Sequence, residues 1–197
     1  MSGVETVQLV VGLGNPGAGH VEDRHNVGFW LVDALAARLK TELGRESRYK
    51  GELGRAVSGL RLLKPSTYMN LSGEAVAPCA TYFRIAPPQV LVVHDELDLP
   101  VGSVRLKRGG GHGGHNGLRS IEQMLGTQDY LRVRLGIGHP GVGRDVAAYV
   151  LSRPPAAERE AIEAAIAAVL DNFETIINGG FNRAMNTLNQ RVAKPEE

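Results

Sequence analysis

Short apolar runs alternate with stretches of helical apolar spacing along this chain, and that alternation constrains its fold most. The first run, residues 7–11, ends at a Gly/Pro turn, as buried strands commonly do. Similar runs follow at 90–93 and 131–137. Between them, apolar residues recur three or four positions apart. Strands alternating with helices predict an α/β fold, a mixed β-sheet sandwiched by α-helices.

The individual elements follow from the spacing of apolar residues and from the Gly and Pro residues that interrupt these patterns. We expect strands at 7–11, 90–93, 101–107 and 131–137, and a hairpin of 49–57 with 60–63. We expect helices at 26–43, 70–83, 118–125, 156–177 and 181–188. Asn26 is a candidate cap for the first of these helices. The C-terminal helices are expected to pack on one side of the sheet, and the tail from about residue 190 to fray.

Length and composition favour one domain over residues 1–197, large enough to fold without disulfide or metal. Cys79 is the sole cysteine, so no intrachain disulfide can form, which suits a reducing compartment. The first residues, MSGVETVQLVVGLG, lack a basic segment, and their apolar run is too short for a signal peptide or membrane span. We therefore expect a cytoplasmic protein with no membrane contact.

Charge is unevenly distributed along the chain. The formal net charge is only +1, yet residues 101–155 contain eight Lys and Arg against three Asp and Glu. Such asymmetry indicates either a polyanionic partner on one face or a solvated basic surface.

Five polar residues lie in or beside abrupt ends of apolar runs: Asn15, His25, Asn70, Asp95 and Asn116. A core would not need them, so we expect them to face a solvent-accessible cleft. Neutral amides beside one base suggest that a carbonyl-rich substrate is held there while water is activated.

The segment GLGNPG (12–17) matches the G-x-G-x-x-G pattern of dinucleotide-binding loops. In those loops the helix begins inside the motif, with its N-terminus on the pyrophosphate. Here Pro16 and AGHVEDRHN (18–26) intervene, and no acidic residue ends a second strand at the required place. We favour a wide loop that presents Asn15 over a cofactor site; an ordinary turn is the other alternative.

His25 and Asp95 are the candidate base and its support. Asp95 follows a short apolar strand, and a carboxylate there can point into the crevice where α/β sheets bind ligands. It can fix the tautomer of an imidazole and raise its basicity. Glu96 and Asp98 compete for this role on sequence grounds.

Two other chemistries are disfavoured. His112 and His115 in GGGHGGHNG (109–117) could bind a metal with His94 or Asp95, but the spacing fits no standard zinc pattern. No G-x-S-x-G is present, and Cys79 falls on a helix face expected to be core.

Several segments resemble the bacterial peptidyl-tRNA hydrolase family, in family order over most of residues 9–141. They are GLGNPG, RHNVGFW, KPSTYMNLSG, HDELDLP, GGGHGGHNGLRSI and VRLGIGHPG. The resemblance implies a single-domain α/β hydrolase, usually monomeric, with no required protein partner. It implies cleavage of the ester between a peptide and the terminal ribose of tRNA, without metal or cofactor.

By that resemblance His25 is the general base and Asp95 supports it. Asn15 would screen the substrate's amino group, and Asn70 and Asn116 would hold the peptide or the attacking water. The resemblance further implies substrate-groove contacts by Tyr68 and Met69, and a tRNA-binding basic region containing Lys107 and Arg134.

The family often has Tyr five residues before the base, where this chain has His20. We expect His20 to contact substrate in an altered way. Two other classes remain for comparison: an RNA-binding module that has lost hydrolysis, and a nucleotide or NAD enzyme with a Gly-rich loop. The intact His25 and Asp95 argue against the first, and failure to retain NAD or ATP would remove the second.

Overall fold

Seven strands form the sheet in this computed structural model, which describes residues 5–190. They are β1 (Leu9–Gly12), β2 (Gly44–Glu46), β3 (Gly51–Arg55), β4 (Arg61–Pro65), β5 (Val90–Glu96), β6 (Val104–Arg108) and β7 (Leu131–Gly136). Their order is β2-β3-β4-β1-β5-β7-β6. The four central strands β4, β1, β5 and β7 run parallel, and β2, β3 and β6 add antiparallel edges. The expected mixed sheet is confirmed.

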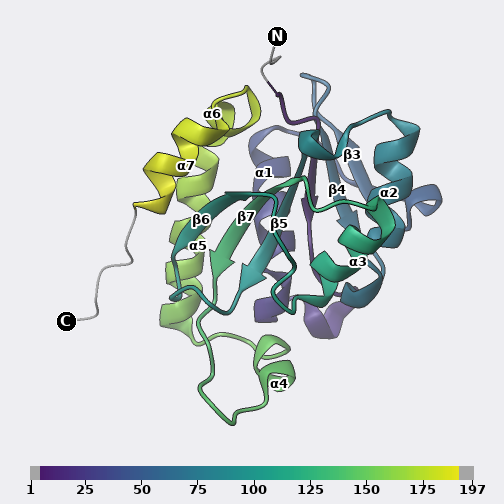
Figure 1. The fold of residues 1–197 in the computed structure, drawn as a ribbon. Helices are drawn as coiled ribbons and strands as arrows, with labels where there is room; N and C mark the ends of the chain where they lie inside the picture. Colours follow the sequence, from purple (N-terminus) through teal and green to yellow (C-terminus); the bar gives the residue numbers. More distant parts are fainter. Residues whose placement is uncertain (1–4, 191–197) are drawn as a thin grey trace.

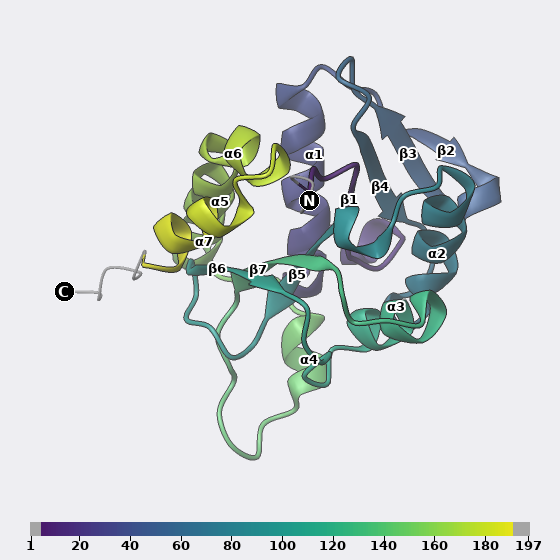
Figure 2. The same ribbon diagram turned by 45° about the horizontal axis from the view of Figure 1, so that its top comes forward.

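Helices cover both faces of this sheet (Figures 1 and 2). They are α1 (Val27–Arg38), α2 (Gly73–Tyr82), α3 (Asn116–Leu125), α4 (Val146–Val150), α5 (Ala156–Asp171), α6 (Phe173–Ile177) and α7 (Phe181–Asn189). Three short 3₁₀ turns matter for the site: η1 (Ala18–His20), η2 (Arg24–Asn26) and η4 (Met69–Leu71). Within the described residues, no helix is long and apolar enough to cross a membrane.

Two apolar cores lie on opposite faces of the sheet. Residues of α1, α5, α6 and α7 pack with Val10, Leu91 and Val133 on one face. Residues of α2 and α3 pack with Val11 and Val92 on the other. Neighbouring strand residues thus alternate between the cores, as the period of two requires. The C-terminal helices pack on one side of the sheet, as predicted.

The parallel strands end at one edge, which prepares a site there. In Figure 1 the arrows of β5 and β7 point down toward α4. The chain leaves β1 toward Asn15, leaves β4 toward Met69 and ends β5 at Asp95 and Glu96. Because carboxyl ends of parallel strands share an edge, segments distant in sequence meet at this crevice.

Gly28 brings the start of α1 onto the ends of β1 and β5. A Cβ at this position would lie 2.5 Å from the carbonyl oxygen of Val93 and 2.6 Å from the backbone nitrogen of Leu13. Only glycine permits this approach without moving backbone. Since His25 precedes Gly28 by three residues, this contact sets His25 beside the end of β5.

Some boundaries differ from the sequence predictions. The first helix was expected to reach residue 43, but α1 ends at Arg38 and Lys40 turns with a φ of 50°. That turn lets the chain enter β2, an edge strand whose sequence GRE has no apolar alternation. The helix expected at 70–83 begins as the turn η4, and α2 proper starts at Gly73.

The C-terminal half also differs. The expected helix 156–177 is broken into α5 and α6 at Asn172, whose side-chain amide donates 2.9 Å to the carbonyl of Ala168. Such local bonds compete with helix continuation. The short helix α4 was not predicted. Residues 191–197, where fraying was expected, lie outside the described residues.

Candidate active site

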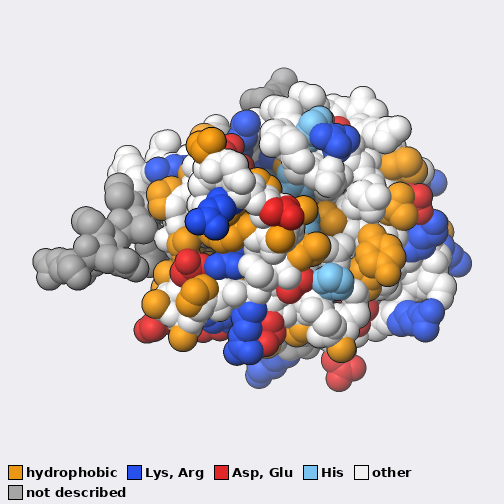
Figure 3. Space-filling model, turned by 90° about the horizontal axis from the view of Figure 1, so that it is seen from below, with side chains coloured by type: hydrophobic (Ala, Val, Ile, Leu, Met, Phe, Trp, Pro, Cys, Tyr) orange, Lys and Arg blue, Asp and Glu red, His pale blue; other side chains and the backbone are white. Residues whose placement is uncertain are grey.

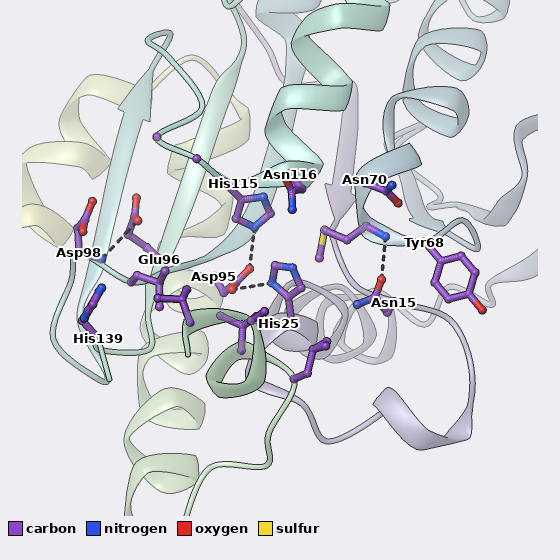
Figure 4. Close-up of a pocket in the computed structure, with 18 residues that line it drawn as sticks. Asn15, His25, Tyr68, Asn70, Asp95, Glu96, Asp98, His115, Asn116 and His139 are labelled. Carbon is purple, nitrogen blue, oxygen red and sulfur yellow. Dashed lines mark hydrogen bonds and ion pairs between the residues drawn. The ribbon is translucent and has the colours of Figure 1, made fainter. Parts of the chain in front are cut away.

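A cavity of about 820 Å³ opens at the carboxyl edge of the parallel strands. Figure 3 views this face from below and shows histidine side chains within a hollow. Figure 4 shows the lining residues, and Asn15, His25, Asn70, Asp95 and Asn116 are all among them. The polar residues singled out in the sequence therefore converge on one cavity.

The centre of the cavity is a carboxylate shared by two histidines. One oxygen of Asp95 lies 2.8 Å from Nδ1 of His25, and the other lies 2.8 Å from Nε2 of His115. Asp95 is 3% exposed, so both of its oxygens are satisfied inside the protein rather than by bulk water. The competitors Glu96 and Asp98 also line the cavity, but the carboxylate bonded to His25 is that of Asp95.

Hydrogen bonding fixes the tautomer of His25. Its Nδ1–H donates to the ionised Asp95, which leaves a lone pair on Nε2. In Figure 4 that second nitrogen points to the side of the cavity where Asn15, Asn70 and Asn116 lie. His25 can therefore accept a proton from a molecule bound in the cavity.

His115 is held in the opposite tautomer. Its Nδ1 caps α3 by accepting from the backbone N–H groups of Gly117 and Leu118 at 3.1 and 3.3 Å. Since Nδ1 accepts, Nε2 bears the proton that is donated to Asp95. Both nitrogens of His115 are thus committed, and it supports Asp95 rather than serving as a second base.

Burial and the Asp95 charge oppose each other at His25. Burial lowers the pKa of His25, but the charge and hydrogen bond of Asp95, with help from Asp23, outweigh it and raise the pKa above the ordinary value. Burial would raise the pKa of Asp95, but its interactions with His25 and His115 hold that pKa well below the usual range. Burial and nearby His115 lower the pKa of His94 to about 3, so His94 is neutral.

Asn15 is held by a chain of amide hydrogen bonds. Its backbone N–H donates to Oδ1 of Asn26 at 2.8 Å, and Nδ2 of Asn26 donates to the carbonyl of Asn15 at 3.0 Å. The side-chain oxygen of Asn15 accepts from the N–H of Met69 at 2.7 Å. Its amide nitrogen is left for the cavity. The expected capping role of Asn26 is wrong in one respect, because its side chain makes these bonds and none to the helix.

Three further lining residues are more accessible than Asn15: Tyr68, Asn70 and Asn116. Asn70 and Asn116 are exposed, and Oδ1 of Asn116 accepts from Arg119 at 3.0 Å, which leaves its amide nitrogen for a ligand. Tyr68 is 63% exposed at the rim, whereas Met69 is buried beneath it. These two residues line the cavity, as does Asn15.

The wall opposite is α4, which Arg24 ties to the turn that carries His25. The buried guanidinium of Arg24 lies 4.1 Å from the ring centre of Tyr149 and donates to Oγ of Ser152 and to Glu158, at 2.5 and 2.8 Å. Arg24 thus links the turn that contains His25 to a cavity wall more than 120 residues later in the chain.

Three predicted contact residues lie outside this cavity. His20, in η1, pairs with Asp23 at 2.6 Å between Nδ1 and the carboxylate. Arg134, on β7, pairs with Glu96 at 2.8 Å. Lys107 lies half-buried on β6. Substrate contacts by these residues stay predictions.

Sequence reasoning missed the roles of His115 and Asn26 and the α4 wall. His115 was considered only as a metal ligand. The available clue was the position of His115 immediately before the helix, where a side chain can accept from the first backbone N–H groups. Asn26 was identified as a candidate helix cap, but its side chain could instead bond the backbone of a neighbouring loop. Only the fold decides between these two partners.

His25, Asp95 and His115 also form a cluster whose ligand atoms lie within 4.8 Å of one another. A cation bound there would displace the protons that link both imidazoles to Asp95. Since Nδ1 of His115 is already committed to the α3 cap, Nε2 must keep its proton, and the set fits a hydrogen-bonded network better than a metal site. Burial raises the pKa of Cys79 to about 11, so this core thiol is no nucleophile.

The fold and the site define an α/β protein with a histidine–carboxylate pair at the floor of an amide-lined cavity. The family model described as peptidyl-tRNA hydrolase matches residues 9–196. A curated peptidyl-tRNA hydrolase of Halorhodospira halophila is 51% identical over 184 residues, covering 92% of this chain and 95% of that protein. One of Haemophilus influenzae is 49% identical over 187 residues, covering 93% and 96%.

Solved structures agree. The crystal structure of peptidyl-tRNA hydrolase from Acinetobacter baumannii superposes with a TM-score of 0.91 at 42% identity, covering 96% of this chain and 98% of that one. The chain belongs to the peptidyl-tRNA hydrolase family.

Proposed function

We propose that this protein hydrolyses the ester bond between a peptide, or an N-blocked aminoacyl group, and the terminal ribose of tRNA. The observation that carries the proposal is the hydrogen bonding and orientation of the His25 imidazole. Its Nδ1 is bound to buried Asp95 while Nε2 faces an amide-lined cavity of about 820 Å³. Family membership supplies the substrate class.

The reaction needs only water and these side chains. Nε2 of His25 takes a proton from a water as the water oxygen attacks the ester carbonyl carbon. The ester C–O bond to the ribose then breaks, and the imidazolium returns the proton to the ribose oxygen. Asp95 stabilises the imidazolium between these steps. Free tRNA and free peptide leave.

The asparagines suit a substrate rich in neutral carbonyls. The amide nitrogens of Asn70 and Asn116 can donate to the oxyanion that develops on the carbonyl or to the peptide. Asn15 presents an amide nitrogen held at a fixed place by Met69. Because these donors have no net charge, they can orient an acyl group without also attracting anions.

The tRNA contact is assigned to the basic region of β6, β7 and α3. Arg105 and Lys107 alternate along β6, opposite Arg134 and Arg132 of β7. Arg132 is buried and donates to the Gly110 and Gly111 carbonyls, so it supports the Gly-rich loop rather than a phosphate. Contacts from Lys107 and Arg134 would hold the phosphate backbone of the tRNA and carry no sequence information.

The proposal includes a monomeric, cytoplasmic enzyme that needs no metal, cofactor or protein partner. Its substrate contacts are the acceptor stem, the 3′ end and the nascent peptide. The decisive experiment incubates the protein with N-acetyl-aminoacyl-tRNA and a chelator and follows release of free tRNA. Binding without release would favour an RNA-binding module, and loss of activity on chelation would contradict the metal-free mechanism.

A further inference from the structure

A second cavity, of about 380 Å³, lies beside the active-site cavity, and Asn15 lines both. Its walls come from three places. They are the loop of residues 16–21 after β1, the start of α1, and the adjoining ends of β3 and β4. The two cavities are therefore neighbours on either side of one fixed residue.

The second cavity is preformed. Nε1 of Trp30 donates 2.8 Å to the carbonyl of Val21, which ties the loop to α1. The His20–Asp23 pair closes the next turn of the same loop at 2.6 Å. Asn26, at its inner end, is fixed by two bonds to the backbone of Asn15. A ligand would therefore bind without the entropy cost of ordering these walls, and this favours binding.

The lining suits a peptide rather than a nucleotide. Phe29 and Trp30 offer aromatic surface, and the Lys64 ammonium lies 4.9 Å from the ring centre of Phe29. Lys64 is paired with Asp33 at 2.8 Å and with Glu52 at 3.4 Å. One ammonium against two carboxylates leaves the lining with one net negative charge, which disfavours a phosphate and tolerates a basic side chain.

The two ends of the active-site cavity differ in the residues that line them. This difference indicates how the substrate is oriented in the cavity. In Figure 4, Glu96, Asp98 and His139 lie on one side of His25, and Asn15, Asn70 and Tyr68 lie on the other. Glu96 is paired with Arg134 of the basic region, so that end adjoins the proposed tRNA contact. The amide end then faces the peptide, and the second cavity continues beyond it.

We propose that the second cavity binds the upstream part of the peptide, the residues on the N-terminal side of the esterified one. Its ligand class is an extended peptide with apolar side chains, in which a basic residue is preferred to an acidic one. This inference rests on the proposed function and deepens it. It makes this enzyme respond to peptide length, since a single N-blocked residue reaches only the active-site cavity.

The test compares substrates with the same tRNA and the same esterified residue. They carry an N-acetyl group directly, or after one, two or three further phenylalanines. For the unaltered protein, kcat/KM should rise with length and then level off. Ser66, exposed at the rim of the second cavity, is replaced by Trp to fill it. Ser66→Trp should reduce the long-peptide advantage about tenfold, the scale for burying part of an apolar side chain.

Ser58→Trp, on the distant β3–β4 turn, is the matched control and should leave every substrate unchanged. If Ser66→Trp fails to fold, Ala18→Trp on the loop wall of the second cavity serves the same purpose. Asp33→Asn should lower the preference for an upstream Lys over Glu about two- to threefold, a modest effect because Asp33 is half exposed.

Several outcomes would overturn the inference. One is cleavage of all lengths with equal kcat/KM, and another is an undiminished length advantage with both cavity-filling variants. Either result leaves the proposed function intact. If no substrate of any length is cleaved, the proposed function falls and this inference falls with it.

Discussion

Asp95 accepts a hydrogen bond from Nε2 of His115 on the oxygen that it does not share with His25. The buried carboxylate is therefore held from both sides. Because the other nitrogen of His115 caps α3, the position of Asp95 is coupled to the start of that helix. His115 can thus affect the reaction without touching the substrate.

Two variants of His115 should separate its two roles. Asn is a good N-cap but is too short to reach Asp95, so His115→Asn should keep the cap of α3 and lower kcat about tenfold, as expected for losing one charge-assisted hydrogen bond. His115→Ala should also lose the cap and lower the free energy of unfolding by about 1 kcal/mol more than His115→Asn does. Steady-state kinetics and thermal unfolding measure these effects. Normal kcat in His115→Asn would argue against coupling to Asp95.

His25→Ala removes the proposed base. We expect kcat to fall by at least ~10²-fold, the usual scale for losing a general base. Binding of N-acetyl-aminoacyl-tRNA should survive, since the asparagines and the basic region remain. Single-turnover kinetics and a filter-binding assay give the two quantities. Near-normal turnover would show that another group activates water.

Asp95→Asn tests the charge on the base. The folded protein raises the pKa of His25 because of Asp95, so activity should rise with pH through a midpoint above the ordinary value of about 6.5. An amide cannot stabilise the imidazolium in this way, and its NH₂ group would face one of the two histidine N–H donors. We expect kcat to fall and the acid limb to move to lower pH. An unchanged rate with an unmoved limb would refute the role of Asp95.

The sheet and the convergence of the polar residues could be predicted because both follow from local pattern. Apolar runs give the strands, and polar residues at carboxyl ends of parallel strands must meet at one edge. Asp95 was paired with His25 because it ends such a strand, and its carboxylate oxygen lies 2.8 Å from Nδ1 of His25. The β2 strand and α4 were missed because GRE and VAAYV are too short to show a period.

The remaining errors concern long-range choices between partners. Asn26 could cap α1 or bind the loop of Asn15, and only the packing of Gly28 on β1 and β5 brings that loop within reach. His115 lies in a Gly-rich loop without period, 20 positions from Asp95. Sequence spacing does not show which of the nearby histidines faces the carboxylate.

Lys107→Ala tests the basic region. Loss of one phosphate contact should raise KM for different tRNAs alike and reduce the slope of log K against log salt by about one unit or somewhat less. Arg134→Ala should do the same more weakly, because Arg134 already pairs with Glu96. Arg55→Ala, on the exposed end of β3, is the control. An unaltered KM for both variants would place the tRNA contact elsewhere.

Asn15→Asp tests how the enzyme distinguishes its substrate. An unblocked aminoacyl-tRNA has a largely protonated α-amino group, whereas peptidyl-tRNA has a neutral amide. The oxygen of Asn15 already accepts from Met69, so the group that faces the cavity is the amide nitrogen, a donor that cannot replace the water around an ammonium. Selectivity then includes rejection of the charged substrate.

Asp has the shape of Asn and can still accept from Met69, so the loop should keep its place. Its second oxygen would replace the donor with an acceptor that stabilises an ammonium. The ratio of kcat/KM for N-blocked over unblocked aminoacyl-tRNA should therefore fall in Asn15→Asp, by about tenfold for a partly desolvated charge-assisted hydrogen bond. Asn15→Ala controls for simple loss of the side chain, because it removes the donor without adding a charge. A ratio that Asn15→Asp leaves unchanged, with activity retained, would mean that Asn15 does not read the amino group.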